Sequence, residues 1–147
     1  MNRITVLVAD DHISARGGTK GILDAEKDMA VVGEASDGEE AVAMARRLMP
    51  DVAVLDIVMP RLDGIEATRL IKEHCPNTAV LLLSIYDDRQ YVVGALAAGA
   101  DGYLMKNVRA PQLVRAVREV HAGEFDPNRW LAWSAIEHHA TGSPAVR

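Results

Sequence analysis

The stretch ITVLVADD (residues 4–11) joins a short apolar run to a pair of acidic residues, and three later stretches repeat this pattern. DVAVLD ends at Asp56, AVLLLS ends at Ser84, and DGYLMK ends at Lys106. If these apolar runs are parallel strands of one sheet, the polar residues at their ends project from the same carboxyl edge. The sequence therefore predicts one crevice formed by Asp10, Asp11, Asp56, Ser84 and Lys106.

Apolar runs alternate with segments of helical spacing along most of the chain. The runs predict strands over about residues 4–9, 30–34, 52–55, 79–83 and 101–104. The segments between and after them predict helices over about residues 13–25, 38–48, 64–74, 87–98 and 110–122. This alternation predicts an α/β fold with a five-stranded parallel sheet and helices on both faces. We expect the flavodoxin-like, doubly wound type, with the strand order 2-1-3-4-5. Ligands bind where the strand order reverses, and here that point lies between the strands that end at Asp10-Asp11 and at Asp56.

Composition limits the class of protein. The 147 residues are 49% hydrophobic and 25% charged, which suits one globular domain. The formal net charge of −5 argues against direct nucleic-acid binding by this chain. The first residues do not resemble a signal peptide, no apolar stretch has the roughly 20 residues that cross a bilayer, and Cys75 has no second cysteine to pair with. We therefore expect a cytoplasmic protein without a membrane partner.

The chain changes character after Gly123, and we expect a C-terminal extension over residues 124–147 that follows a main domain over residues 1–123. Asp126 and Pro127 are typical of a helix start, so a short helix is predicted over 127–138, followed by a disordered tail. Trp130 and Trp133 lie roughly one turn apart on that helix. They could pack on the main domain, form a homodimer contact or serve as a docking helix.

The predicted crevice suits a divalent cation and a phosphoryl group. Clustered carboxylates repel one another, and Mg²⁺, which prefers oxygen ligands, relieves that repulsion. A carboxylate such as Asp56 can attack phosphorus and form an aspartyl phosphate, a transfer that needs mainly positioning and charge neutralisation. The Lys106 ammonium would supply a counter-charge to the phosphoryl oxygens, and the Ser84 hydroxyl would donate a hydrogen bond to them.

In combination, LVADDH, VLDIVMPRLDG, LLLS and GADGYLMK resemble the receiver domain of two-component response regulators over about residues 3–123. The resemblance implies that a sensor histidine kinase phosphorylates Asp56, that Lys106 binds the phosphoryl group, and that Ser84 and Tyr103 are switch residues. It also implies Mg²⁺ ligands from Asp10, Asp11, Asp56 and the backbone carbonyl of Val58. A receiver is not an enzyme, and only self-phosphorylation and slow self-dephosphorylation are expected.

The DDH triplet, GADGYLMK and VRAVREVHAGE are most similar to the NarL/LuxR branch, whose full-length members carry a helix-turn-helix DNA-binding domain. Residues 124–147 are too few for such a domain. We therefore expect either the receiver of a longer transcription regulator or a single-domain receiver with an unusual tail. In the switch that the resemblance implies, phosphorylation draws Ser84 toward the phosphoryl group, Tyr103 rotates inward, and the helix over 87–98 shifts.

Some positions depart from the common receiver pattern. Asn107 stands where many receivers have proline, so the cis peptide bond that accompanies that proline is unsupported here. Ile85 is larger than the residue often found beside the switch hydroxyl and could slow phosphoryl exchange. Val58 and Tyr86 occupy positions that tune phosphoryl lifetime in relatives, and an apolar Val58 cannot orient an attacking water. Slow self-hydrolysis is the resulting expectation.

Three other classes of protein remain open. A Mg²⁺-dependent phosphohydrolase of the haloacid dehalogenase type would have a second acid two residues after its nucleophile, where this chain has Val58. A flavodoxin-like cofactor binder would have a phosphate loop rich in Gly, Ser or Thr after the first strand, whereas DDHIS repels phosphate without a metal. A pseudo-receiver that binds partners without phosphorylation would not need the complete set of polar residues, so their presence argues against this class. The large Ile85 beside the switch hydroxyl is nevertheless compatible with it.

Overall fold

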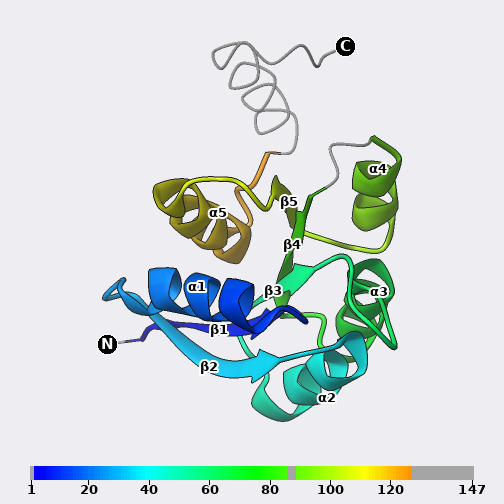
Figure 1. Ribbon diagram of the computed structural model, residues 1–147, viewed down its shortest axis with the longest axis horizontal. Helices are drawn as coiled ribbons and strands as arrows, with labels where there is room; N and C mark the ends of the chain where they lie inside the picture. The colour runs from blue at the N-terminus through cyan, green and yellow to red at the C-terminus, as the bar shows by residue number, and fades with distance from the viewer. Residues whose placement is uncertain (1, 86–88, 127–147) are drawn as a thin grey trace.

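A five-stranded parallel sheet with five helices forms the part of the chain that the computed structural model describes, residues 2–85 and 89–126 (Figure 1). The strands are β1 (Ile4–Ala9), β2 (Met29–Ala35), β3 (Val52–Asp56), β4 (Ala79–Ser84) and β5 (Gly102–Met105). The helices are α1 (Ile13–Asp24), α2 (Gly38–Leu48), α3 (Gly64–His74), α4 (Arg89–Ala97) and α5 (Ala110–Ala122). The strand order β2-β1-β3-β4-β5 and the parallel pairing confirm the predicted topology.

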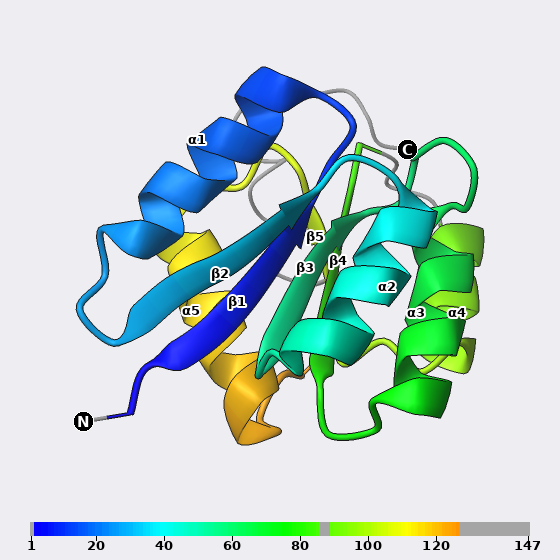
Figure 2. The same cartoon turned by 90° about the horizontal axis from the view of Figure 1, so that it is seen from below.

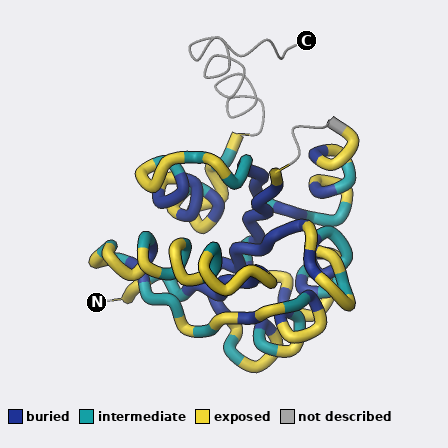
Figure 3. The backbone as a smooth tube through the Cα atoms, viewed as in Figure 1, coloured by how far each residue is buried: buried dark blue, intermediate teal, exposed yellow. Residues whose placement is uncertain are grey.

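The helices cover the sheet on both faces, as Figure 2 shows, with α1 and α5 on one face and α2, α3 and α4 on the other. Alternate residues of each strand enter one of two apolar clusters: Leu7 packs on the α2–α4 side, and Val8 packs on the α1–α5 side. The sheet is consequently buried through its centre (Figure 3). Buried strands of this kind are the reason that the sequence shows continuous apolar runs.

Two helices begin at aspartates whose side chains accept backbone hydrogen bonds. Asp37 accepts from the backbone nitrogen of Glu40 at 2.8 Å and caps α2, and Asp63 accepts from that of Glu66 at 2.8 Å and caps α3. At its other end α2 stops at Met49, which adopts the left-handed conformation (φ 50°) directly before Pro50. Short-range signals of this kind explain why the predicted bounds of α2 and α3 match the structure.

The predicted bounds of β5 were wrong by one residue at each end. Asp101 is not part of the strand, because its carboxylate accepts hydrogen bonds from the Val80 backbone nitrogen at 2.8 Å and from Lys72 Nζ at 3.0 Å. These bonds hold Asp101 in the turn that enters the strand, so β5 starts at Gly102 and continues to Met105. The other predicted ends that fall on described residues either match the structure or differ from it by a single residue, as at Asp24 and Asp56.

Several predictions fall on residues that the structure does not describe. The first two residues predicted for the fourth helix, the tuning position Tyr86, and the helix over 127–138 with the tail that follows all lie outside the described residues. The proposed boundary at residue 123 also remains a prediction. Within the described ranges, none of the helices is both long enough and apolar enough to cross a bilayer.

Candidate functional site

The carboxylate of Asp10 is fixed at the point where the strand order reverses. Asp10 follows β1 directly, exposes only 4% of its surface, and donates its backbone N–H to the carbonyl of Ala35 at 3.0 Å. Its Oδ1 accepts the backbone N–H of His12 at 2.9 Å, and its carbonyl accepts a hydrogen bond from Arg16 Nη1 at 2.9 Å. The loop between β1 and α1 is therefore held at both ends, and it holds the Asp10 carboxylate at the carboxyl edge of the sheet.

Lys106 joins two carboxylates that are far apart in the sequence. Its Nζ lies 2.9 Å from Oδ2 of Asp10 and 3.0 Å from Oδ2 of Asp56. Asp56 is the last residue of β3 and exposes 5% of its surface, while its Oδ1 accepts the backbone N–H of Val58 at 3.2 Å. The lysine follows β5 and donates its own backbone N–H to the Ser84 carbonyl at 2.8 Å. The ends of β1, β3 and β5 thus deliver one cation and two anions to the same place.

Asp11 and His12 complete an open side of this cluster. Ligand atoms of Asp10, Asp11, His12 and Asp56 all lie within 4.8 Å of one another, and Asp11 and His12 are exposed whereas Asp10 and Asp56 are buried. Carboxylate oxygens from three residues, open to solvent on one side, fit a hard divalent cation that keeps several waters. The predicted meeting of Asp10, Asp11, Asp56 and Lys106 therefore occurs in the structure.

Ser84 and Tyr103 lie on neighbouring strands at the same edge. Ser84 ends β4 one residue beyond Leu83, the residue that pairs with Asp56, and exposes 1% of its surface. Tyr103 of β5 pairs with Leu82, two residues before Ser84, so Ser84 and Tyr103 project from the same face of the sheet. Tyr103 exposes 8% of its surface and belongs to the apolar cluster on the α2–α4 side. Its ring is thus already buried, the arrangement that the sequence led us to expect only after phosphorylation.

The described residues that depart from the common receiver pattern directly follow, or closely follow, the site residues Asp56, Ser84 and Lys106 in the chain. Val58 exposes 50% of its surface and donates its backbone N–H to Asp56 Oδ1, whereas Ile85 exposes 64% and lines a shallow pocket with Lys106 and Asn107. The described residues contain no cis peptide bond, so the Lys106–Asn107 peptide is trans. The direction of the Val58 carbonyl toward a metal remains a prediction.

Burial and charge act in opposite directions on the protonation of this site. Burial raises the pKa of the Asp56 carboxyl, although its hydrogen bond to Lys106 opposes the shift. Burial also disfavours the charged form of Lys106, but its hydrogen bonds to Asp10 and Asp56 outweigh that effect and raise the Lys106 pKa. The lysine consequently stays charged, while an ionised Asp56 costs the folded state free energy.

We expect Asp56→Asn to stabilise the metal-free protein at neutral pH by about 1 kcal/mol, or roughly 3–4 °C in Tm for a chain of this size. Because the folded-state pKa of Asp56 lies above its unfolded value, ionisation destabilises the fold above both values, and that penalty disappears as the pH falls below the unfolded value. Thermal melts in EDTA across pH 3–8 should therefore show a gain that is largest near neutrality and vanishes in acid. A variant less stable than the wild type at pH 7 would mean that the pairing with Lys106 outweighs burial.

Sequence reasoning missed two residues of the site. His12 places its Nδ1 3.2 Å from Asp11 Oδ1 and 3.5 Å from Asp10 Oδ1. Its position in the DDH triplet was the available signal, because a residue adjacent to an acidic pair at a strand end must remain near that edge. Arg16 fixes the Asp10 carbonyl and also pairs with Glu34 at 3.2 Å. Nothing in the sequence distinguishes this arginine from an exposed helix residue.

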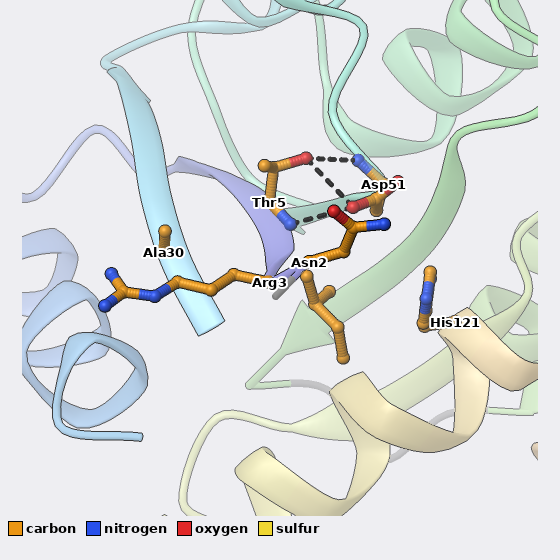
Figure 4. Close-up of a pocket in the computed structure, with 7 residues that line it drawn as sticks. Asn2, Arg3, Thr5, Ala30, Asp51 and His121 are labelled. Carbon is orange, nitrogen blue, oxygen red and sulfur yellow. Dashed lines mark hydrogen bonds between the residues drawn. The ribbon is translucent and has the colours of Figure 1, made fainter. Parts of the chain in front are cut away.

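A cavity of about 640 Å³ lies at the opposite, amino edge of the sheet, and Asn2, Arg3, Thr5, Ala30, Asp51 and His121 are among its lining residues (Figure 4). Its one carboxylate is already engaged: Asp51 Oδ2 accepts hydrogen bonds from the backbone nitrogen and hydroxyl of Thr5 at 2.9 and 3.1 Å. The Arg3 side chain points away from Asp51. The Thr5–Asp51 pair therefore ties β1 to the start of β3, and the reactive groups gather at the other edge.

Comparison with known proteins finds relatives over most of the chain. The family model described as "Response regulator receiver domain" matches residues 6–118. The transcriptional regulatory protein DegU of Brevibacillus brevis is 43% identical over 122 residues, which cover 83% of this chain and 52% of the relative. The response regulator protein VraR of Staphylococcus aureus is 40% identical over 126 residues, which cover 84% of this chain and 60% of the relative. The chain thus spans between half and two thirds of the length of these relatives.

The fold also matches solved structures. The signal receiver domain of the putative response regulator NarL from Mycobacterium tuberculosis superposes with a TM-score of 0.82 at 36% identity. That match covers 84% of this chain and 99% of the solved domain. The family match over residues 6–118 includes Asp10, Asp56 and Lys106.

Proposed function

The chain belongs to the response regulator receiver family, in its NarL/LuxR-like branch, and we propose that it works as a phosphorylation switch with Asp56 as the phosphoacceptor. The observation that carries the proposal is the ammonium of Lys106, held within 3.0 Å of both Asp10 and Asp56. It brings a fixed positive charge to the buried carboxylate at the strand-reversal point, where the negative charge of a phosphoryl group would need neutralising.

In the proposed reaction, a carboxylate oxygen of Asp56 attacks the phosphorus of a donor such as a phosphohistidine of a sensor kinase. A new oxygen–phosphorus bond forms, the bond from phosphorus to the donor breaks, and the donor group leaves with the bonding electron pair. Lys106 keeps its contact with Asp10 and turns its remaining donors to the phosphoryl oxygens. The product is an acyl phosphate on Asp56 and a donor without its phosphoryl group.

The carboxylates of Asp10, Asp11 and Asp56 lie close enough together to hold one Mg²⁺. The proposal adds the backbone carbonyl of Val58 as a further oxygen ligand. When bound there, Mg²⁺ would neutralise charge on the incoming phosphoryl group. Asp10 and Asp56 each offer one oxygen to Lys106, and their other oxygens accept the backbone N–H groups of His12 and Val58. The apolar and half-exposed Val58 cannot orient a water for attack, so the proposal includes slow loss of the phosphoryl group.

The proposed conformational response passes through Ser84 and Tyr103. A phosphoryl group on Asp56 would add acceptor oxygens near the end of β4 and draw the Ser84 hydroxyl toward them. Tyr103, on the same face of the neighbouring strand, already lies in the core cluster that includes Val92 of α4. Phosphorylation would therefore favour this buried position of Tyr103 over an exposed one and thereby fix the position of α4.

The output of the whole protein belongs to the proposal as well. DegU is named a transcriptional regulatory protein, and this chain covers 52% of its length. We infer that phosphorylation controls transcription through a DNA-binding domain that this chain does not include. A sensor histidine kinase as donor, a homodimer as an output state, and a cytoplasmic location complete the proposal. The chain itself, with its net charge of −5, would not bind nucleic acid directly.

Acetyl phosphate, Mg²⁺ and intact-mass measurement test the phosphoacceptor. We expect one phosphoryl adduct on the wild type and none on Asp56→Asn, because the amide cannot act as the nucleophile. Asp63→Asn is the matched control: it makes the same substitution at the exposed cap of α3, where asparagine caps equally well, and should form the adduct as the wild type does.

Other results would favour the competing classes. An adduct that persists in Asp56→Asn would place the phosphoacceptor elsewhere. Absence of any adduct in the folded wild type would identify a pseudo-receiver. Sustained release of phosphate from phosphate esters would indicate a phosphohydrolase, a class already disfavoured by the apolar side chain of Val58.

A further inference from the structure

We propose that His12 makes the acidic cluster selective for divalent transition-metal ions over Mg²⁺, with the imidazole Nδ1 as a ligand beside the carboxylates of Asp10, Asp11 and Asp56. The inference rests on the proposed function, because it concerns the metal preference of the same site. The Mg²⁺ site proposed above uses oxygen ligands alone. An imidazole at its open side changes which ions the site binds most tightly.

The backbone around His12 is held on both sides. Its N–H donates to Asp10 Oδ1 at 2.9 Å, and its carbonyl accepts the backbone N–H of Arg16 at 2.9 Å in the first turn of α1. Arg16 in turn donates to the Asp10 carbonyl. The residue is therefore anchored to the carboxylate that it would assist, and the imidazole starts from a fixed point at the rim of the cluster.

The imidazole Nδ1 of His12 already lies close enough to the carboxylate oxygens for a small movement to bring them around one metal ion. Its Nδ1 is 3.2 Å from Asp11 Oδ1 and 3.5 Å from Asp10 Oδ1, and one ligand atom from each of the four residues falls within 4.8 Å of the others. Nitrogen and oxygen ligands lie about 2.0–2.2 Å from such an ion, so two of them can be up to roughly 4.2 Å apart. A small inward movement of the exposed side chains would let one ion contact all four residues.

His12 and Lys106 act on different atoms. Lys106 contacts Oδ2 of Asp10 and Oδ2 of Asp56, whereas His12 faces Oδ1 of Asp10 and Oδ1 of Asp11. An ion on the His12 side therefore does not need to displace the lysine. The fold, for its part, does not depend on this imidazole: His12 is the cap residue of α1, but its side chain makes no capping hydrogen bond and is 71% exposed.

Ligand chemistry then separates the two kinds of ion. Mg²⁺ prefers oxygen ligands and gives up its waters reluctantly, so an imidazole adds little to its binding. Ni²⁺ shares the octahedral preference that a carboxylate and water site can satisfy, but it also binds imidazole strongly. The cluster should therefore bind Ni²⁺ more tightly than Mg²⁺, and the difference should depend on His12.

Calorimetric titration of the EDTA-treated, dialysed full chain with Ni²⁺ and with Mg²⁺ tests this assignment. Every protein compared carries His138→Ala and His139→Ala, because this adjacent pair of histidines could bind Ni²⁺ independently. In that background, His12→Ala should weaken Ni²⁺ binding by at least about tenfold. Even the loss of a group that only orients a metal ligand typically weakens metal binding by this factor, and the loss of a direct ligand should weaken it at least as much. Its Mg²⁺ affinity should stay within about twofold of the background protein.

The matched control is His74→Ala, since His74 also lies beside a carboxylate, with Nε2 3.6 Å from Glu73 Oε1, but away from the cluster. It should leave both affinities unchanged. Equal Ni²⁺ affinity with and without His12, in protein that still binds Mg²⁺, would overturn the inference and leave the proposed function intact. If neither ion binds the folded protein, the proposed metal site itself fails. Thermal melts confirm that each variant is folded.

Discussion

Gly64→Ala should destabilise the protein by about 2–3 kcal/mol, although alanine ordinarily stabilises a helix relative to glycine. Gly64 is the first residue of α3, and a Cβ added to it would collide with the backbone carbonyl of Asp56 and approach the Cα of Ile57 to 2.8 Å. The Gly64 N–H also donates to the Ile57 carbonyl at 2.7 Å. Because the obstacles are backbone atoms, no side-chain rotation can relieve the collision, and α3 or the end of β3 has to move.

Gly64→Ala should also slow the phosphorylation of Asp56, because the added Cβ collides with the backbone of Asp56 itself. Chemical denaturation of Gly64→Ala measures the loss of stability, and the rate of adduct formation with acetyl phosphate measures the displacement of Asp56. Gly17→Ala is the control: Gly17 lies inside α1, and no atom outside its own helix turn lies within 4 Å of the position that a Cβ would take there. The same substitution should therefore stabilise the protein by about 0.5–1 kcal/mol. Opposite signs at the two glycines are the expected result, and a Gly64→Ala protein as stable as the wild type would contradict it.

The sequence was sufficient for those parts of the site that depend on topology. Asp10, Asp56 and Lys106 each follow an apolar run, and parallel strands place such residues at one edge whatever their side-chain rotamers. The ends of α2 and α3 were equally accessible, because the caps Asp37 and Asp63 act within one turn. Features set by chain direction and by local hydrogen bonds can therefore be predicted without coordinates.

Features that depend on packing between distant elements could not be predicted. Nothing in the sequence shows that Lys106 divides its hydrogen bonds between Asp10 and Asp56, since that depends on the separation of β1, β3 and β5 at their ends. The burial of Tyr103 depends on how α4 packs against β5. The start of β5 moved because Asp101 is held by bonds to Lys72 and Val80, residues from two other elements.

The second large effect is expected at Lys106, where Lys106→Met should change two properties in opposite directions. Removing the ammonium leaves the carboxylates of Asp10 and Asp56 without their shared cation, so the cluster becomes more negative and Mg²⁺ should bind about tenfold more tightly. Phosphorylation by acetyl phosphate at saturating Mg²⁺ should nevertheless slow by at least about a hundredfold, the effect of losing one fixed donor to a developing anion.

These opposed changes separate the proposed role from simple loss of structure, because a damaged site would weaken Mg²⁺ binding and slow phosphorylation together. Calorimetry gives the Mg²⁺ affinity, and a time course of intact mass gives the phosphorylation rate. Lys20→Met is the matched control, since Lys20 pairs with Asp24 at 2.8 Å on the exposed side of α1 and should leave both quantities unchanged. A Lys106→Met protein that binds Mg²⁺ more weakly than the wild type would show that the lysine supports the metal site rather than competing with it. A variant with an undiminished phosphorylation rate would show that the positive charge between Asp10 and Asp56 serves the stability of the fold and not the transfer.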